Sequence, residues 1–204
     1  MSSMSATNTP TIVLFHSALG LRPGVRVFAD RLRSAGFTVH TPDLYEGQVF
    51  TDLDEGVKVR DAVGIPGILG RATAAVEKLP RDLVYAGFSM GAGAAAFLAA
   101  TRPGARAAIL MHGAPPLSKF GMAPWSGVPV QLHYAEKDPW VDAASVKELA
   151  AEVPRSGARY EAFTYPGDGH LFADPDLPEY DASSADAMLD RIQAFVRNAT
   201  ARDR

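Results

Sequence analysis

The chain has 204 residues, 47% of them apolar, and a formal net charge of -3, so it can bury one sizeable core and a single domain is expected. The slightly acidic balance argues against nucleic acid or an anionic membrane as the main partner, and no apolar run approaches the ~20 residues of a membrane helix. Cysteine is absent, which excludes disulfides, a thiol nucleophile and cysteine metal ligands, and suits a reducing cytoplasm.

The first part of the chain is a polar segment followed by an apolar run. Residues 1–10 lack the basic and apolar regions of a signal peptide, so we expect an extended or disordered N-terminus and a single domain over residues 11–200. Thr11–Phe15 is continuously apolar, as in a strand buried on both faces of a parallel sheet. A helix from about Gly24 to Ala35 and a strand from Thr38 to Thr41 are predicted next.

Residues 48–80 are the hardest part to interpret. Asp52 to Val63 favours a helix, glycine and proline interrupt residues 64–70, and a second helix is predicted from about Arg71 to Lys78. We therefore expect two short helices with a break between them, in a segment that is a candidate for shaping a substrate cleft.

A serine-containing turn lies between the next strand and helix. Leu83–Tyr85 predicts a buried strand and Ala92–Ala100 a helix. Residues 87–91 between them match G-x-S-x-G, the nucleophile elbow. The two glycines permit a sharp turn, which leaves Ser89 exposed at its tip with strained backbone angles. The alternative is a glycine-rich turn without chemistry.

The same stretch contains a weaker motif. Residues 91–96 fit G-x-G-x-x-A, the dinucleotide fingerprint. That fingerprint needs an acidic residue at the end of the next strand, and this strand ends in Met111-His112-Gly113. We therefore expect no cofactor here and interpret Gly93 as a small packing residue.

The rest of the chain continues the alternation of strands and helices. Strands are predicted at Ala107–Met111, Pro129–Tyr134 and Arg159–Tyr165, with helices near residues 143–153 and 184–198. This order predicts an α/β fold with a mostly parallel sheet of about six strands and helices on both faces. In such sheets the site lies beyond the carboxyl ends of the strands.

Three residues that follow predicted strands have the chemistry of a hydrolase. They are Ser89, Asp138 and His170, in that order along the chain. A serine needs a base to take its proton, an imidazole titrates near neutrality, and a carboxylate fixes its tautomer. Asp142 and Asp174 are rivals for the acid, although Asp142 is better placed to cap the following helix.

The other histidines are weighed separately. His40 and His133 lie inside strands and are interpreted as packed there, whereas His16 is a candidate for shaping an oxyanion loop. For His112 a place in the cleft and a structural role are left open. No cluster has metal-ligand spacing, so no metal is expected.

Four segments of the chain carry a further similarity: Pro42–Tyr45, Gly87–Gly91, Glu136–Asp138 and Pro166–Phe172. Together they resemble the dienelactone hydrolase family of α/β-hydrolases. The resemblance covers nearly the whole chain and implies an α/β-hydrolase fold. Because only about ten residues precede the first predicted strand, we expect a minimal form of this fold without the antiparallel hairpin that opens larger members. It also implies an oxyanion hole made by the backbone N–H groups of Met90 and Ala18.

Three positions depart from the family pattern. Ser89 replaces the usual cysteine, Ser17 stands where a glutamate is typical, and Asp174 occupies the place of an arginine that holds the substrate carboxylate. Hydrolase chemistry is compatible with these changes, but the dienelactone substrate does not follow. Asp174 either faces the cleft and repels anionic substrates or points to solvent and caps the Pro175–Pro178 turn.

The sequence therefore predicts a cytoplasmic, cofactor-free serine hydrolase that cleaves a small carboxylic ester, lactone or thioester through an acyl-enzyme. The alternatives are a non-catalytic binding module of the same fold and an acyltransferase. A monomer or homodimer is expected. Apolar side chains near the strand ends, including Phe120, predict a shallow pocket for short acyl chains. The candidate pocket residues are His16, Ser17, Glu46, His112, Met122, Trp125, Trp140, Phe172 and Asp174.

Overall fold

The computed structural model describes residues 9–201, so most of the expected extended or disordered segment 1–10 lies outside the described residues. Strands and helices alternate as the sequence predicts, most within two residues of the expected bounds. In chain order they are β1 (Thr11–Phe15), α1 (Pro23–Ser34), β2 (Thr38–His40), α2 (Leu53–Val76), β3 (Leu83–Phe88), α3 (Met90–Thr101), β4 (Ala107–Met111), the 3-10 helix η1 (Ser118–Phe120), β5 (Val130–Ala135), α4 (Ala143–Arg155), β6 (Tyr160–Tyr165) and α5 (Ala182–Thr200).

The strands form one sheet in the order β2-β1-β3-β4-β5-β6, and each pairing within the described residues is parallel. Every residue of β3 and β4 is buried, as their continuous apolar sequences predict. Phe15 pairs with Gly87 and Phe88 with Met111, so β1, β3 and β4 end side by side. The expected class, a six-stranded parallel sheet of the α/β-hydrolase type, is confirmed.

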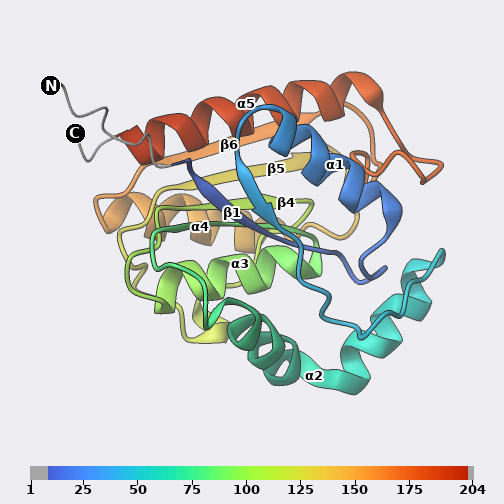
Figure 1. The fold of residues 1–204 in the computed structure, drawn as a ribbon, viewed down its shortest axis with the longest axis horizontal. Coiled ribbons are helices and arrows are strands. Elements are labelled where there is room, and N and C mark those ends of the chain that lie inside the picture. Colours follow the sequence, from blue (N-terminus) through green and yellow to red (C-terminus); the bar gives the residue numbers. More distant parts are fainter. Residues whose placement is uncertain (1–8, 202–204) are drawn as a thin grey trace, which may run out of the picture.

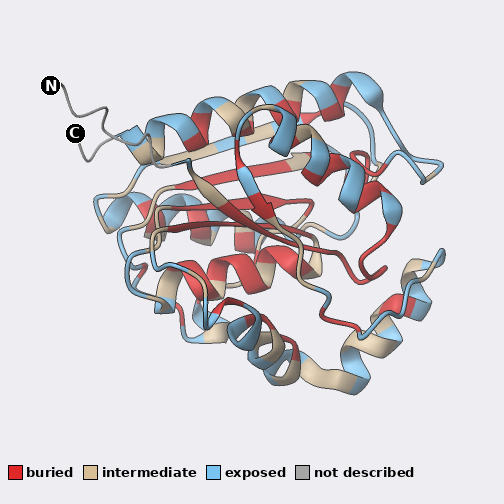
Figure 2. Cartoon of the chain, in the orientation of Figure 1, coloured by how far each residue is buried: buried red, intermediate tan, exposed pale blue. Residues whose placement is uncertain are grey.

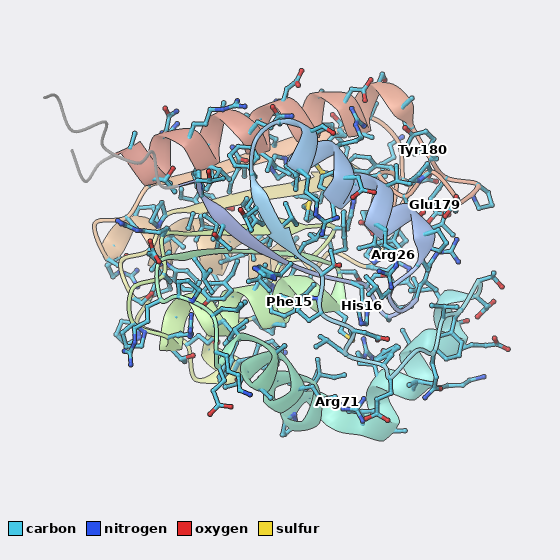
Figure 3. All side chains as sticks on the ribbon, viewed as in Figure 1. Phe15, His16, Arg26, Arg71, Glu179 and Tyr180 are labelled. Carbon is cyan, nitrogen blue, oxygen red and sulfur yellow. The ribbon has the colours of Figure 1, made fainter. Side chains whose placement is uncertain are left out.

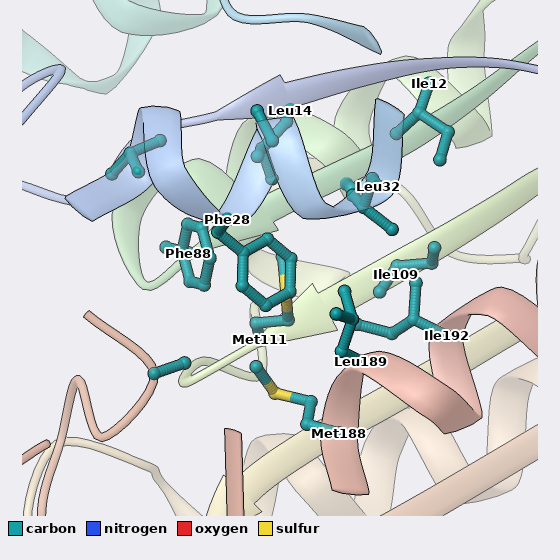
Figure 4. Close-up of a cluster of buried hydrophobic side chains, with 14 of the residues drawn as sticks. Ile12, Leu14, Phe28, Leu32, Phe88, Ile109, Met111, Met188, Leu189 and Ile192 are labelled. Carbon is teal, nitrogen blue, oxygen red and sulfur yellow. The ribbon is translucent and has the colours of Figure 1, made fainter. Parts of the chain in front are cut away.

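Helices cover both faces of the sheet (Figure 1). Helices α1 and α5 pack on one face, in the cluster around Phe28, Phe88 and Ile192 (Figure 4). Helices α2, α3 and α4 share the other cluster, which includes Ala72, Leu98 and Leu149. No helix between residues 9 and 201 is long and apolar enough to cross a membrane.

The expected break between two helices is present within α2, but it is narrower than predicted. It is confined to Gly64, whose φ of 75° and ψ of 152° are non-helical, so a kink at this glycine separates two helical segments and the second begins directly after it. Proline is tolerated there because Pro66 stands in the first turn after the break. Figure 2 shows that α2 is mostly half-buried or exposed; only Gly56, Ile68, Ala72 and Val76 are buried.

Candidate active site

Ser89 lies at the tip of a strained turn between β3 and α3. Its φ of 51° and ψ of -110° are unfavourable for a residue with a side chain, at a cost on the order of 1–3 kcal/mol. Two features make this turn possible. Gly87 lies so close to the Gly91 carbonyl that a Cβ at Gly87 would collide with it. The Ser89 N–H donates to the Met111 carbonyl oxygen at 2.7 Å. The expected elbow geometry is therefore present.

The structure brings the three expected polar side chains into one hydrogen-bonded chain. His170 Nε2 lies 2.8 Å from Ser89 Oγ, and His170 Nδ1 lies 2.8 Å from Asp138 Oδ2. An ionised carboxylate only accepts, so Nδ1 carries the proton and Nε2 is left to accept from the serine hydroxyl. Asp138 also accepts the Trp140 N–H at 2.9 Å, which fixes the carboxylate. Both Asp138 and His170 are buried.

The two rival carboxylates lie elsewhere. Asp142 caps α4 by accepting from the backbone N–H groups of Ala144 and Ser145, as expected for a helix cap. Asp174 is buried and bonded to Arg22, with Nε 3.1 Å from Oδ2. It faces neither the groove beside Ser89 nor solvent, but its Oδ1 accepts the Asp176 N–H at 3.0 Å, so the expected capping of the turn after it is present.

His16 directly follows β1 and is the first residue of the loop after the strand (Figure 3). The Leu44 N–H donates to its Nε2 at 2.9 Å, so its Nδ1–H donates to the Ser17 carbonyl oxygen at 2.7 Å. Burial lowers the pKa of His16, which keeps the ring neutral in this tautomer. A trans peptide points its C=O and N–H in opposite directions, so this bond also sets the direction of the Ala18 N–H.

The same loop lies against the first turn of α3. A Cβ at Gly91 would collide with the carbonyl oxygens of Phe15 and His16, so the two backbones approach closely. On the other side, a Cβ at Gly56 would collide with the Ala18 carbonyl. These contacts fix the position of Ala18 beside the N-terminus of α3, whose first residue is Met90.

A groove of about 190 Å³ lies beside Ser89. Of the expected pocket residues it contains His112 and Trp140, and Phe120 joins them. Trp140 is 48% exposed and its ring lies 5.8 Å from that of His170. The sequence did not single out Ile65 and Leu69 of α2, which line the facing wall. Their spacing of four residues places them on one face of a helix, but the neighbouring glycines and proline obscure this pattern in the sequence.

The other expected pocket residues do not line this groove. Met122 and Trp125 are core residues of the α2, α3, α4 face, and Phe172 is buried against the His112 ring at 4.5 Å between centroids. The Ser17 hydroxyl accepts the Leu19 N–H. Glu46 is exposed and forms an ion pair with Arg71 of α2. These assignments were wrong because a sequence places residues near strand ends without telling which way they point.

His112 has an unusual environment beside the site. Its φ is 57°, its ring is fully buried, and neither ring nitrogen has a hydrogen-bond partner among the described residues. The ring stacks on Phe88 at 5.6 Å between centroids. Burial holds the pKa of His112 well below its ordinary value, so the ring stays uncharged. Its centroid lies 6.3 Å from that of the His170 ring.

This fold and this arrangement of side chains define an α/β-hydrolase. The model of the dienelactone hydrolase family matches residues 1–200, so the chain belongs to that family of hydrolases. No group of three or more His, Cys, Asp or Glu residues within 9–201 is arranged to hold a metal ion.

Individual relatives are distant. A Bradyrhizobium protein named "Probable 2-oxo-3-(5-oxofuran-2-ylidene)propanoate lactonase" is 24% identical over 207 residues, covering 92% of this chain and 83% of the relative. The solved structure named m3DLH has a TM-score of 0.81 at 21% identity, covering 96% of this chain and 89% of that one. A dienelactone hydrolase from Anabaena variabilis has a TM-score of 0.67 at 22% identity, covering 94% and 88%. At these identities the solved structures show the fold alone.

Proposed function

We propose that this protein is a cofactor-free serine hydrolase that cleaves a carboxylic ester, lactone or thioester through an acyl-enzyme on Ser89. The observation that carries the proposal is the hydrogen-bonded chain from Ser89 through His170 to Asp138 at the tip of a strained elbow. A serine is a weak nucleophile until a base within hydrogen-bond reach takes its proton.

In the first half of the reaction Ser89 Oγ attacks the carbonyl carbon while its proton passes to His170 Nε2. Asp138 stabilises the imidazolium that forms, through the proton on Nδ1. The negative charge that develops on the carbonyl oxygen is stabilised by the N–H groups of Ala18 and Met90 and by the N-terminus of α3. Collapse of the tetrahedral intermediate then breaks the bond to the leaving group, which takes the proton from Nε2.

In the second half a water molecule attacks the acyl-enzyme. His170 Nε2 takes a proton from the water, the second tetrahedral intermediate collapses, and the proton returns to Ser89 Oγ as the acid leaves. Each proton donor and acceptor in both halves is a group of the chain, the substrate or water.

The test is covalent labelling by a fluorophosphonate probe together with hydrolysis of p-nitrophenyl acetate. We expect the wild type to be labelled on Ser89 and to release p-nitrophenol with a burst, and Ser89→Ala to do neither. A folded wild-type protein that is neither labelled nor active would instead favour the binding module without turnover. Transfer of the acyl group to an added alcohol in preference to water would favour the acyltransferase.

A further inference from the structure

The groove beside Ser89 adjoins a second, larger one. This second groove has a volume of about 1230 Å³ and lies between α2 and α3, which run side by side on one face of the sheet (Figure 1). The two grooves share Ile65, Leu69 and Phe120. A molecule bonded to Ser89 can therefore continue into the space beyond it. We call this space the α2–α3 groove.

The α2–α3 groove is long and follows the helices. On α3, Gly93, Phe97 and Thr101 are spaced by four residues and so lie on one helix face. From Gly93 to Thr101 this face extends about 12 Å at 1.5 Å per residue. The opposite wall is the face of α2 that bears Ile65 and Leu69.

The walls are mainly apolar along this length. Ile65 and Trp140 are two of the few large apolar side chains that are more than a third exposed in the described chain, and both lie beside Ser89. Phe97, Leu69 and Phe120 continue the apolar surface into the α2–α3 groove and are only partly buried. Exposed apolar side chains that line a concave surface are typical of a ligand-binding groove.

The end of the α2–α3 groove far from Ser89 is positively charged. Two cations, Arg81 and Arg102, line it with one carboxylate, that of Glu77. Arg102 is fixed, because its guanidinium donates to backbone carbonyls including that of Val76. Arg81 is exposed and can reorient. A carboxylate is therefore favoured at this end over a cation.

The position of His170 indicates which part of a substrate extends into the groove. His170 reaches Ser89 from the loop after β6, at the far edge of the sheet from α2. The leaving group must lie at His170 Nε2 to take its proton. The acyl group, which stays on Ser89, is left to extend along α3.

We propose that the α2–α3 groove binds the acyl chain of the substrate, and that the preferred substrates are esters or thioesters of straight-chain acids about as long as decanoate with a carboxylate at the far end. The proposal rests on the proposed serine hydrolase function. It replaces the shallow pocket for short acyl chains that the sequence suggested, because that expectation took no account of a continuous groove along α3.

The test compares kcat/KM for three methyl esters: methyl acetate, methyl decanoate and monomethyl decanedioate. We expect the decanoate to exceed the acetate and the decanedioate to exceed the decanoate, with the second preference declining at high salt. Equal rates for the acetate and the decanoate in the wild type would overturn the proposal.

Gly70 offers a site at which to block the groove. A Cβ there meets no atom within 4 Å, and a larger residue is favoured over glycine inside a helix. Gly70→Phe should lower the decanoate-to-acetate ratio at least ~10-fold, since every methylene that stays in water loses its burial energy. Thr73→Phe, one turn further along the groove, gives a second blocking variant. Ala151→Phe, on the exposed face of α4, is the matched control and should keep the wild-type ratio.

The charged end is tested separately. Arg81→Gln should reduce the decanedioate-to-decanoate ratio severalfold. An unchanged ratio in this variant would overturn the assignment of the carboxylate.

Direct binding separates failure of this proposal from failure of the proposed function. Decanedioate should bind Ser89→Ala in a calorimetric titration, and Gly70→Phe in that background should weaken it. Absence of binding overturns the groove proposal whatever the catalytic result. The groove proposal would also be overturned if neither Gly70→Phe nor Thr73→Phe changed the decanoate-to-acetate ratio. If the wild type still hydrolysed the acetate and were labelled on Ser89, the proposed serine hydrolase function would stand.

Discussion

Arg22 and Asp174 form a buried ion pair that joins the loop after β1 to the loop that carries His170. Arg22 Nε lies 3.1 Å from Asp174 Oδ2, and Arg22 Nη1 donates to the Phe50 carbonyl oxygen at 2.7 Å. One guanidinium therefore connects three segments around the site. Asp174 therefore anchors the loop that carries His170. Because Arg22 neutralises its negative charge, Asp174 does not repel an anionic substrate.

Removing the carboxylate should destabilise the protein. Asp174→Ala leaves a buried guanidinium without its partner, a change that costs about 3–5 kcal/mol in comparable buried pairs. The free energy of unfolding in urea measures this loss. Asp186→Ala, which breaks the exposed pair with Arg31, is the control and should cost far less. Equal losses in the two variants would show that the Arg22–Asp174 pair does not anchor the loop.

The acid of the proposed triad can be tested by substituting each carboxylate in turn. Asp138→Asn should lower kcat by up to ~10⁴, because the histidine loses the partner that fixes its tautomer. Asp142→Ala should leave kcat near the wild-type value, since that side chain only caps α4. Steady-state kinetics on p-nitrophenyl acetate measures both. A large loss in Asp142→Ala with none in Asp138→Asn would contradict the assignment.

His16 should act on the reaction through the loop that it holds. His16→Asn loses the bonds to Ser17 and Leu44, so the Ala18 N–H is no longer directed. Loss of one oxyanion donor costs about 10²–10³ in kcat, and this sets the upper limit of the effect. We expect kcat to fall while KM changes little, because the charge develops only in the transition state.

A merely structural role of His16 gives a different result. His40→Asn, on the edge strand β2, is the control, since His40 lies outside the lining of the groove. If His16→Asn and His40→Asn both lost stability and neither changed kcat, His16 would not position the oxyanion hole.

The sequence brings Ser89, Asp138 and His170 together because local patterns determine the elbow and the strands. The G-x-S-x-G turn needs only its own glycines, and Asp138 and His170 each follow a strand that pattern and length reveal. Parallel strands bring their carboxyl ends to one edge of the sheet, so the order along the chain is enough to bring the three residues together.

The environment of the site is less predictable because it depends on packing between distant segments. Asp174 and Arg22 are 152 positions apart, and neither has a local pattern that pairs them. The direction of Met122 and Trp125 follows from how the loop after β4 folds onto the α2, α3, α4 face. The α2–α3 groove arises from two helices whose relative placement no local sequence feature specifies.

Replacing His112 by phenylalanine should stabilise the protein. Its two ring nitrogens are buried without partners among residues 9–201, and an unsatisfied buried polar group costs about 1–3 kcal/mol. His112→Phe removes this cost and keeps an aromatic ring against Phe88 and Phe172. We expect the free energy of unfolding in urea to rise, whereas His112→Ala should lower it by opening a cavity.

The gain from His112→Phe should depend on pH. Burial lowers the pKa of His112 in the folded state, whereas the unfolded chain takes up the proton near the ordinary value of about 6.5. His112 therefore makes the wild type lose stability as the pH falls below about 6.5, by up to ~1.4 kcal/mol per pH unit for this group. His112→Phe lacks this contribution and keeps those of His16 and His133, whose pKa values burial also lowers. The difference between the two proteins should widen from pH 8 to pH 5.5. A stability of His112→Phe below that of the wild type at both pH values would mean that the imidazole nitrogens are satisfied by ordered water.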